Sequence, residues 1–276
     1  MTHDLLHLVA VAERAARVGG DIVAAHFGQL SAGVTSKGPG DYVSEVDLTS
    51  EAAVREALAR DAPGVAFFGE EHGGDRAELG WVVDPLDGTA NFLHSFPIVG
   101  VSVALVEGGC PIVGVVHAPM LGETYTAARG HGAHRSGVRL RVADREVTQA
   151  ICATGFPFRI KDRLAAYRRV FDGAFTAFED LRRPGAASLD LAWTAAGVFD
   201  GFFELGLGAW DVAAGALLVQ EAGGIVTDWA GNERDWLRSG DILAAPAPVH
   251  QVLLELARAG AGAGTGAGAG AGAGAG

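Results

Sequence analysis

Acidic residues stand directly after two short apolar runs, and this arrangement constrains the fold of the chain more than any other feature. Two of them follow the run 65–68 and two follow the run 81–83; they are Glu70, Glu71, Asp84 and Asp87. Carboxylates three residues apart across a turn that contains proline can converge on one point, and carboxylate oxygens suit Mg²⁺. Four acids at the ends of two strands would repel one another unless cations or protons intervened. The sequence therefore predicts a Mg²⁺ site at the ends of these strands.

Each acid taken singly also has an ordinary structural explanation. Asp84 and Asp87 are typical turn or helix-capping residues, because an aspartate side chain readily accepts backbone N–H bonds. Glu70 and Glu71 would fit a solvated loop. Only the combination of the four favours a metal site over these explanations.

Two further segments add to the pattern. Gly88 and Thr89 can begin a helix through Phe92 whose free N–H groups point at an anion, and the Thr89 hydroxyl can orient a water molecule. On its own, a Gly-Thr pair is usually just a turn. Asp211 opens a helix of small residues in Trp210-Asp211-Val212-Ala213-Ala214-Gly215, where its simplest role is an N-cap. A carboxylate from this distant segment would complete a site for several metal ions.

Hydrophobic periodicity divides residues 1–259 into a sheet-rich half and a half of alternating strands and helices. In the half 1–146 we expect helices at 4–27 and from 47 to about 59, a loop at 37–41, and strands at 65–68, 81–83, 98–106, 112–118, 123–128, 132–135 and 140–142, with a hairpin turn at 108–111. In the half 147–259 we expect strands at 151–154, 202–204, 225–227 and 242–245, and helices at 164–178, 189–196, 212–222 and 248–257. This order predicts an α/β or α+β protein with stacked layers of helices and sheets.

Composition argues against several classes of protein. A hydrophobic content of 49 % with 20 % charged residues is typical of a globular protein, and the net charge of −12 opposes a broad attraction to nucleic acid. Cys110 and Cys152 form no disulfide framework or zinc motif, which fits a reducing cytoplasm. No apolar run approaches the ~20 residues that span a bilayer, and residues 1–27 lack a signal-peptide core. Residues 260–276 alternate Gly and Ala, so we expect a disordered tail there.

Four motifs together resemble the inositol monophosphatase family, the Mg²⁺-dependent, lithium-sensitive phosphatases. They occur in the family's order, and the likeness extends from the first helix to about Ala257; they are Asp41-Tyr42-Val43-Ser44-Glu45-Val46-Asp47, Gly69-Glu70-Glu71, Asp84-Pro85-Leu86-Asp87-Gly88-Thr89-Ala90-Asn91-Phe92 and Trp210-Asp211-Val212-Ala213-Ala214-Gly215. The resemblance implies a layered αβαβα sandwich of the inositol-phosphatase and fructose-bisphosphatase type, and a homodimer. The half 1–146 would carry most metal ligands, and the half 147–259 would carry Asp211 and residues of the substrate pocket.

The resemblance also implies a set of metal ligands. Glu70, Asp84 and the Leu86 carbonyl would bind one Mg²⁺ ion. Asp84, Asp87 and Asp211 would bind a second. Glu70 would in addition help to hold a weaker third ion. Because the bridging carboxylates make the site strongly anionic, metal binding should be coupled to folding around it.

The same resemblance assigns the catalytic groups. Thr89 and Asp47 would orient the attacking water, although Asp47 is also a natural cap for the helix that follows it. Glu70 would contribute to catalysis through the ions that it binds. Lys37 matches a lysine on the mobile loop of the family, and without the resemblance it would pass for a solvated loop cation.

Substrate would contact residues from several segments, which are Asp87, Gly88, Thr89, Ala187, Glu204 and Asp211. Glu204 matches a family acid that accepts hydrogen bonds from inositol or sugar hydroxyls. The segment Gly185-Ala186-Ala187 lies where the family carries Gly-Ser/Thr-Ala, and Ala186 lacks the hydroxyl of that pattern. A missing hydrogen bond to substrate predicts that the pocket accepts several polyol phosphates.

The sequence therefore predicts a Mg²⁺-dependent phosphomonoesterase that hydrolyses inositol-1-phosphate or a related small polyol or sugar phosphate, with no nucleic-acid or membrane partner. Fructose-1,6-bisphosphatase and histidinol-phosphate phosphatase remain alternatives, because both use the same metal site. Adenosine nucleotides rank last, since the segment 91–97 looks like that of the inositol-phosphatase group. The alternative of another class is a non-catalytic regulatory or binding protein that retains the fold.

Overall fold

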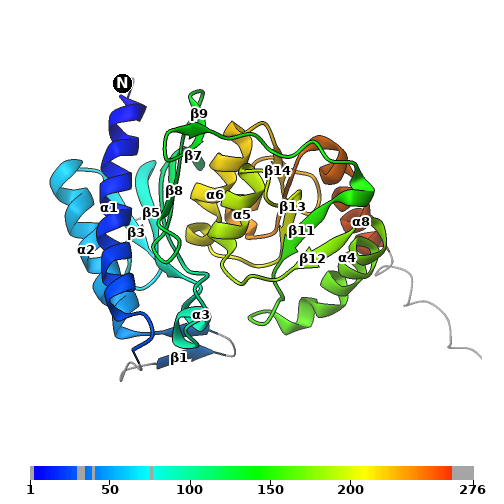
Figure 1. Ribbon diagram of the computed structural model, residues 1–276, viewed down its shortest axis with the longest axis horizontal. Coiled ribbons are helices and arrows are strands. Elements are labelled where there is room, and N and C mark those ends of the chain that lie inside the picture. Colours follow the sequence, from blue (N-terminus) through cyan, green and yellow to red (C-terminus); the bar gives the residue numbers. More distant parts are fainter. Residues whose placement is uncertain (1–2, 30–34, 39–40, 75–76, 263–276) are drawn as a thin grey trace, which may run out of the picture.

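Helices and sheets alternate in five layers in the computed structural model, which describes residues 3–29, 35–38, 41–74 and 77–262 (Figure 1). From one side to the other, the layers are a helix pair, an eight-stranded sheet, a second helix pair, a five-stranded sheet and a third helix pair. The predicted layered αβαβα sandwich is confirmed.

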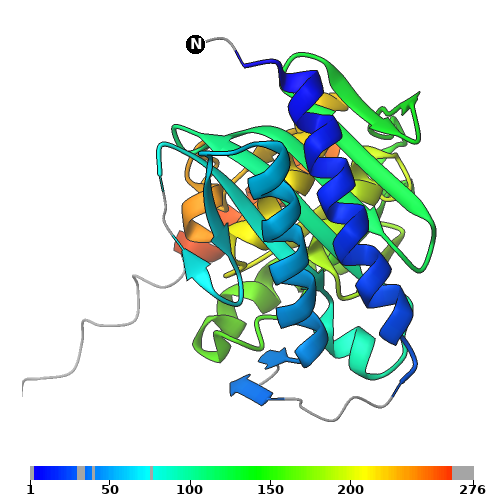
Figure 2. The same ribbon diagram turned by 90° about the vertical axis from the view of Figure 1, so that its left-hand side faces the viewer.

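The first layer consists of α1 (Leu5–His26) and α2 (Glu45–Asp61), which run side by side over one face of the eight-stranded sheet (Figure 2). The face of α1 toward the sheet buries small and branched apolar residues such as Ala12, Ala16 and Val23, which stand at helical spacing in the sequence. Ser44 and Asp47 cap the N-terminus of α2. The Ser44 hydroxyl accepts the Val46 N–H, and the Asp47 carboxylate accepts the Ser44 N–H.

The eight-stranded sheet has the strand order β10-β9-β8-β7-β6-β5-β3-β4. Its strands are β3 (Ala66–Gly69), β4 (Gly73–Gly74), β5 (Leu79–Asp87), β6 (Gly100–Glu107), β7 (Cys110–Ala118), β8 (Glu123–Ala128), β9 (Gly132–Arg135) and β10 (Val138–Arg139). All neighbours are antiparallel except the parallel pair β3 and β5. The predicted hairpin joins β6 and β7.

The five-stranded sheet has the order β12-β11-β13-β15-β14, with parallel pairing around β11 and antiparallel pairing of β15 with both of its neighbours. Its strands are β11 (Ile151–Thr154), β12 (Asp180–Arg182), β13 (Gly201–Glu204), β14 (Ile225–Thr227) and β15 (Ile242–Ala245). Its outer face is covered by α4 (Leu164–Ala177) and α8 (Ala247–Gly262). The expected division between residues 146 and 147 falls in the connection between the two sheets, and whether each half folds independently stays a prediction.

Between the two sheets lie α5 (Ala187–Ala195) and α6 (Ala209–Glu221), and α6 contacts strands of both. A helix packed on two sides must be apolar nearly all round, and an unbroken run of α6 residues, from Asp211 to Val219, is buried. Short elements complete the chain: β1 (Thr35–Gly38), β2 (Asp41–Val43), α3 (Thr89–Leu93), α7 (Trp236–Ser239) and two 3₁₀ turns at 147–149 and 161–163. No helix in the described ranges is both long and apolar enough to cross a membrane.

Away from the acidic segments, three expected elements differ in kind from the structure. The expected loop at 37–41 overlaps a small antiparallel pair, β1 and β2, because β-branched and aromatic residues flank the Gly-Pro-Gly segment. The expected strand at 140–142 lies beyond β10: the Leu140 N–H still bonds to Ala133, but the Val142 N–H bonds to Ala222 at the end of α6. The chain leaves the sheet edge there to join the helix layer. The expected tail begins inside α8, which reaches Gly262, and residues 263–276 lie outside the described part.

Candidate active site

A bulge in β5 brings Asp84 and Asp87 to the same side of the sheet. Asp84 pairs with Ser102 and Asp87 pairs with Gly100 on β6, so three steps along β5 match only two steps along its partner. Residues three apart on a regular strand would point to opposite faces, and the extra residue of a bulge removes that difference. The Pro85-Leu86 step, which the sequence suggested as a turn, is therefore an irregularity inside a strand that continues to Asp87.

Asp211 joins these two carboxylates from the first turn of α6. One ligand oxygen of each of Asp84, Asp87 and Asp211 lies within 4.8 Å of the others, and all three side chains are buried. Asp211 also accepts a 2.6 Å bond from the Gly208 N–H, so its capping role and its place in the cluster coexist. Asp87 caps a helix too, but it is α5, through Ser188, and not α3 that follows it.

Burial and mutual repulsion raise the pKa values of these carboxyl groups. For Asp84, loss of hydration raises the pKa well above its ordinary value, and the charges of Glu70, Asp87 and Asp211 add to this. For Asp87, burial and then the charge of Asp211 raise the pKa to about 7, although hydrogen bonds from Ser188 act in the opposite direction. A cluster of hard oxygen donors that resists ionisation without a counter-charge fits a divalent cation.

Thr89 and Asp47 lie beside this cluster as a bonded pair. The Thr89 hydroxyl donates to Asp47 Oδ1 at 2.9 Å, and it also lies 3.1 Å from the Leu86 carbonyl. Asp47 Oδ2 meanwhile accepts the Ser44 N–H at the start of α2, so the capping explanation for Asp47 holds alongside its bond to Thr89. Burial raises the Asp47 pKa above its usual value. Gly88 makes the sharp entry into α3 with a φ of 89°, which an L side chain rarely adopts.

Glu70 lines the same pocket from the turn after β3, and its charge is one of those that raise the Asp84 pKa. Its backbone N–H bonds to the Val83 carbonyl, which ties the turn to β5. Glu71, the fourth acid of the sequence pattern, is not among the described residues that line the pocket. Its N–H bonds instead to the buried carboxylate of Glu51 on α2. Lys37 lies in β1, and its side chain is outside the described part.

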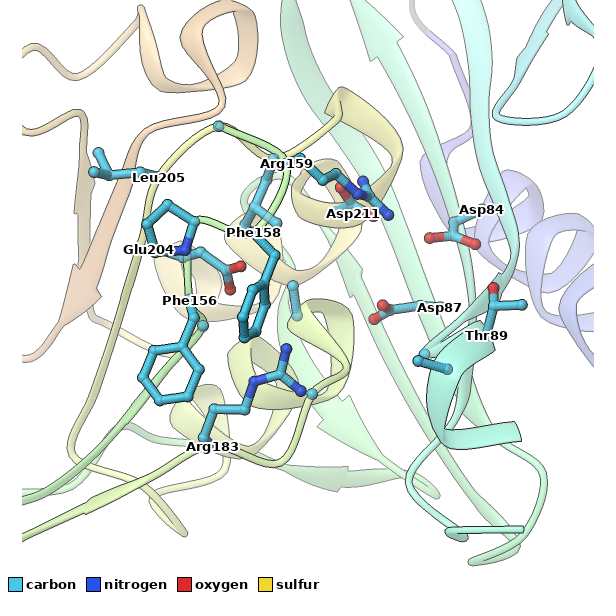
Figure 3. A pocket seen from close by; sticks show the side chains of 18 of the residues that line it. Asp84, Asp87, Thr89, Phe156, Phe158, Arg159, Arg183, Glu204, Leu205 and Asp211 are labelled. Atoms are coloured by element: carbon cyan, nitrogen blue, oxygen red, sulfur yellow. The ribbon is translucent and has the colours of Figure 1, made fainter. Parts of the chain in front are cut away.

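The opposite wall of the pocket carries Glu204 at the end of β13 (Figure 3). Loss of hydration raises the Glu204 pKa to about 8, helped by the charge of Asp211 and opposed by that of Arg183. Ala187 also lines the pocket, as expected. Ala186 does not: its side chain is fully buried in the core, so the missing hydroxyl at this position opens no gap in the pocket wall.

Several residues of this wall were not predicted from the sequence. They come from the loop after β11 and from the segment before α5, and they are Phe156, Phe158, Arg159 and Arg183 (Figure 3). Their only sequence signal was their position: a Gly-Phe-Pro-Phe segment directly after a buried strand is a place where binding loops occur. The two arginines introduce positive charge into a pocket that is otherwise lined by several carboxylates.

Comparison with known proteins agrees with this geometry. The model of the inositol monophosphatase family matches residues 4–260. The chain is 42 % identical over 252 residues to the protein named Nus factor SuhB of Salmonella typhimurium, with 90 % of this chain and 94 % of that protein covered. Among solved structures, the extragenic suppressor protein SuhB of Bartonella henselae has a TM-score of 0.87 at 36 % identity, covering 91 % of this chain and 98 % of that one.

The inositol monophosphatase of Anabaena is also similar, with a TM-score of 0.81 at 32 % identity over 93 % of this chain and 97 % of that one. The family model extends from α1 into α8 and so includes the helices and the strands that carry the pocket. The chain belongs to the inositol monophosphatase family.

Proposed function

We propose that the protein is a Mg²⁺-dependent phosphomonoesterase that hydrolyses inositol-1-phosphate or a related small polyol or sugar phosphate. The observation that carries this proposal is the convergence of Asp84, Asp87 and Asp211 within one pocket, facing Glu204. Membership of the family supports phosphatase chemistry, and the acid on the far wall supports a substrate rich in hydroxyl groups.

Glu70, Asp84, Asp87, Asp211 and the Leu86 carbonyl would hold the ions. Divalent cations bound there would supply activation of the attacking water, neutralisation of the phosphoryl oxygens and stabilisation of the leaving alkoxide. Hydrogen bonds support two of these side chains, since Asp84 accepts from the Leu86 N–H and Asp87 accepts from Ser188. Such preorganisation lowers the reorganisation needed when substrate binds.

Thr89 and Asp47 orient the water in this proposal. Since the Thr89 hydroxyl donates its proton to Asp47 Oδ1, its oxygen lone pairs are directed outward and can accept a proton of the water molecule. As the water loses its proton to the Thr89 oxygen, the proton already on that oxygen passes to Asp47 Oδ1, so the carboxylate is the final proton acceptor. The backbone N–H groups of Gly88 and Thr89 at the start of α3 would face the phosphoryl oxygens.

Glu204 gives the proposed preference for polyol substrates. A carboxyl group on a pocket wall can accept hydrogen bonds from vicinal hydroxyls, and a site that depends on such bonds loses heavily when they are absent. Arg159 and Arg183 line the same wall and would offset the negative charge of the cluster as an anionic substrate enters.

The test is a panel of phosphate monoesters assayed at matched concentrations with Mg²⁺ and with EDTA. We expect turnover only with Mg²⁺, with inositol-1-phosphate and other polyol phosphates above adenosine nucleotides. Glu204→Gln should lower kcat/KM for the polyol phosphates by about tenfold or more, because an NH₂ group replaces one of the two oxygens that can accept hydrogen bonds from hydroxyls. Turnover of p-nitrophenyl phosphate, which offers no hydroxyls, should change little.

Glu255→Gln is the matched control, because Glu255 lies exposed on α8 away from the pocket. Equal losses on both substrates in Glu204→Gln would move Glu204 from specificity to support of the metal site. A marked preference for fructose-1,6-bisphosphate or histidinol phosphate would contradict the proposed substrate and leave the metal chemistry in place.

The name of the Salmonella relative supports a second candidate function. That protein, 42 % identical, is named as a Nus factor and not as a phosphatase, so a regulatory or binding role on the same fold is a candidate for this chain as well. Absence of Mg²⁺-dependent turnover on the whole panel would favour it. Lithium sensitivity, a homodimer, a cytoplasmic location and the lack of a nucleic-acid partner stay predictions.

A further inference from the structure

The carboxylate of Asp87 is held from behind by the first turn of α5, one hundred and one residues further along the chain. Both the backbone N–H and the hydroxyl of Ser188 donate to Asp87 Oδ2, at 2.7 and 2.5 Å. The Ser188 side chain is completely buried. Donors at the N-terminus of a helix stabilise a carboxylate, and hydrogen bonds to an ionised acceptor are stronger than neutral ones.

These two bonds decide which oxygen of Asp87 is left for a cation. Each carboxylate oxygen has about two lone-pair sites, and Oδ2 uses both on Ser188. Oδ1 is then the oxygen that Asp87 offers to the cluster with Asp84 and Asp211. Fixing one oxygen also fixes the plane of the carboxylate, and a metal ligand needs such support to keep its geometry.

The sheet leaves room for this hydroxyl at one glycine. Gly100 on β6 pairs directly with Asp87, and a Cβ built on Gly100 would lie 2.9 Å from Ser188 Oγ. The next atoms that it would meet belong to Leu189, the nearest at 3.4 Å. Any side chain at position 100 must therefore displace the Ser188 hydroxyl, whereas without that hydroxyl an alanine would fit in ordinary contact.

We propose that Ser188 is the positioning residue of Asp87, holding its carboxylate in the orientation that binds the metal ion, and that Gly100 is required because of this hydroxyl. The inference rests on the metal centre of the proposed function. It assigns Ser188 no contact with substrate: the residue acts only through Asp87.

The test measures metal binding directly, by titrating the full-length protein with Mn²⁺ and following free Mn²⁺ by electron paramagnetic resonance. Ser188→Ala should weaken Mn²⁺ binding by about tenfold, the effect expected for loss of a partner that orients a ligand. It should raise the Mg²⁺ concentration for half-maximal turnover by a similar factor, while kcat at saturating Mg²⁺ falls much less. Gly100→Ala should weaken Mn²⁺ binding in the same direction.

The double variant carries the sharpest expectation. Gly100→Ala should have little further effect in the Ser188→Ala background, because the atom that it displaces is already gone. Thr194→Val is the control: Thr194 is another buried hydroxyl on α5, but it bonds to the Asp190 carbonyl of its own helix. This variant should bind Mn²⁺ like the unmodified protein.

Equal Mn²⁺ affinity in the unmodified protein and in Ser188→Ala would overturn the role of Ser188 and leave the metal centre standing. So would full additivity of Ser188→Ala and Gly100→Ala. Loss of melting temperature in Ser188→Ala with unchanged Mn²⁺ affinity would make the serine a purely structural residue. If the unmodified protein binds no Mn²⁺, the metal centre of the proposed function fails, and this inference fails with it.

Discussion

Single residues in this site cap a helix and line or support the candidate active site at once. Asp47 closes the N-terminus of α2 with one oxygen and accepts the Thr89 hydroxyl with the other. Asp211 caps its own helix and also belongs to the acidic cluster. Capping explains why these two residues stand at helix starts. The cluster forms because the start of α6 packs beside the bulge of β5 that carries Asp84 and Asp87.

Thr89→Ala separates the two roles of this pair. We expect the variant to fold and to bind Mn²⁺ normally, because Asp47 keeps its bonds to Ser44. Turnover should fall by about 10²-fold, since the hydroxyl that orients the water is lost. Thr89→Ser, which keeps the hydroxyl, should retain most of the activity. Steady-state kinetics and thermal melts check this, and a melting temperature that falls as far as activity would assign Thr89 to structure alone.

The residues that the sequence analysis singled out stand in recognisable local patterns. The ligand candidates at 84 and 87 were visible because acids stood three apart after an apolar strand, and Asp211 because it opened a helix. Ser188 and Arg183 could not be predicted in this way, because only tertiary packing brings them close to residues that are distant in the sequence. Ser188 meets Asp87 only after β5 has paired with β6 and α5 has packed on β6, and no local sequence pattern indicates that contact.

At the scale of elements, α2 supports the turn that carries Glu70. Its residue Glu51 is a completely buried carboxylate that accepts the backbone N–H groups of Glu71 and His72 and the His72 ring Nδ1. A Cβ on Gly69 would lie 2.3 Å from Glu51 Oε2, so the end of β3 is shaped around this carboxylate. The helix thus holds the Glu70 turn against β5.

Glu51→Ala should lower the free energy of unfolding by about 2–4 kcal/mol, because a completely buried side chain is removed and two backbone N–H groups lose their acceptor. Glu56→Ala is the control on the same helix, since Glu56 is exposed, and it should change stability by less than about 0.5 kcal/mol. Urea denaturation followed by circular dichroism without divalent ions gives both values. Similar values for the two variants would show that the turn does not depend on Glu51.

Elements were predicted best where periodicity and turn signals agreed. The strands 123–128, 132–135 and 151–154 have the predicted bounds, and the helix bounds differ by one to three residues except at the end of α8, which extends five residues further. Bounds were less accurate where tertiary contacts decide them. β5 continues to Asp87 because β6 pairs with it beyond the bulge, and residues 140–142 leave the sheet because the end of α6 accepts the Val142 N–H.

At the scale of the whole molecule, the pocket lies where three layers meet. Asp84 and Asp87 come from the eight-stranded sheet, Asp211 from the middle helix layer and Glu204 from the five-stranded sheet. Packing these layers brings like charges together. We therefore expect the folded state to be less stable when no cations are bound at this point.

The pH dependence of stability checks this. With EDTA, burial and the charge of Asp211 raise the pKa of the folded Asp87 carboxyl to about 7, from an ordinary value of 3.8. Between these values the folded state binds more protons than the unfolded one, so this contribution to stability is present at low pH and is lost as the pH rises through about 7. Asp87→Asn carries no such group. The melting temperature of the unmodified protein minus that of Asp87→Asn should therefore decrease from pH 5 to pH 8.

Mg²⁺ provides the complementary measurement. At pH 8, Mg²⁺ should raise the melting temperature of the unmodified protein by mass action and raise that of Asp87→Asn much less. A melting-temperature difference that stays constant from pH 5 to pH 8 in EDTA would show that Asp87 is ionised throughout and that the neighbouring charges are balanced in another way.

Glu204 closely approaches Gly155, which lines the pocket from the loop after β11, and this restricts how the pocket can change during evolution. A Cβ at position 155 would lie 2.0 Å from the Glu204 carboxyl carbon, so the acid occupies the space that any other residue would need there. Replacing Gly155 alone would displace the Glu204 carboxyl from its place in the pocket wall. Position 155 accepts a side chain without that displacement only after Glu204 has been replaced by a smaller residue. The order in which positions 155 and 204 change, and not only the residues introduced, therefore decides whether the carboxyl keeps its place in this wall.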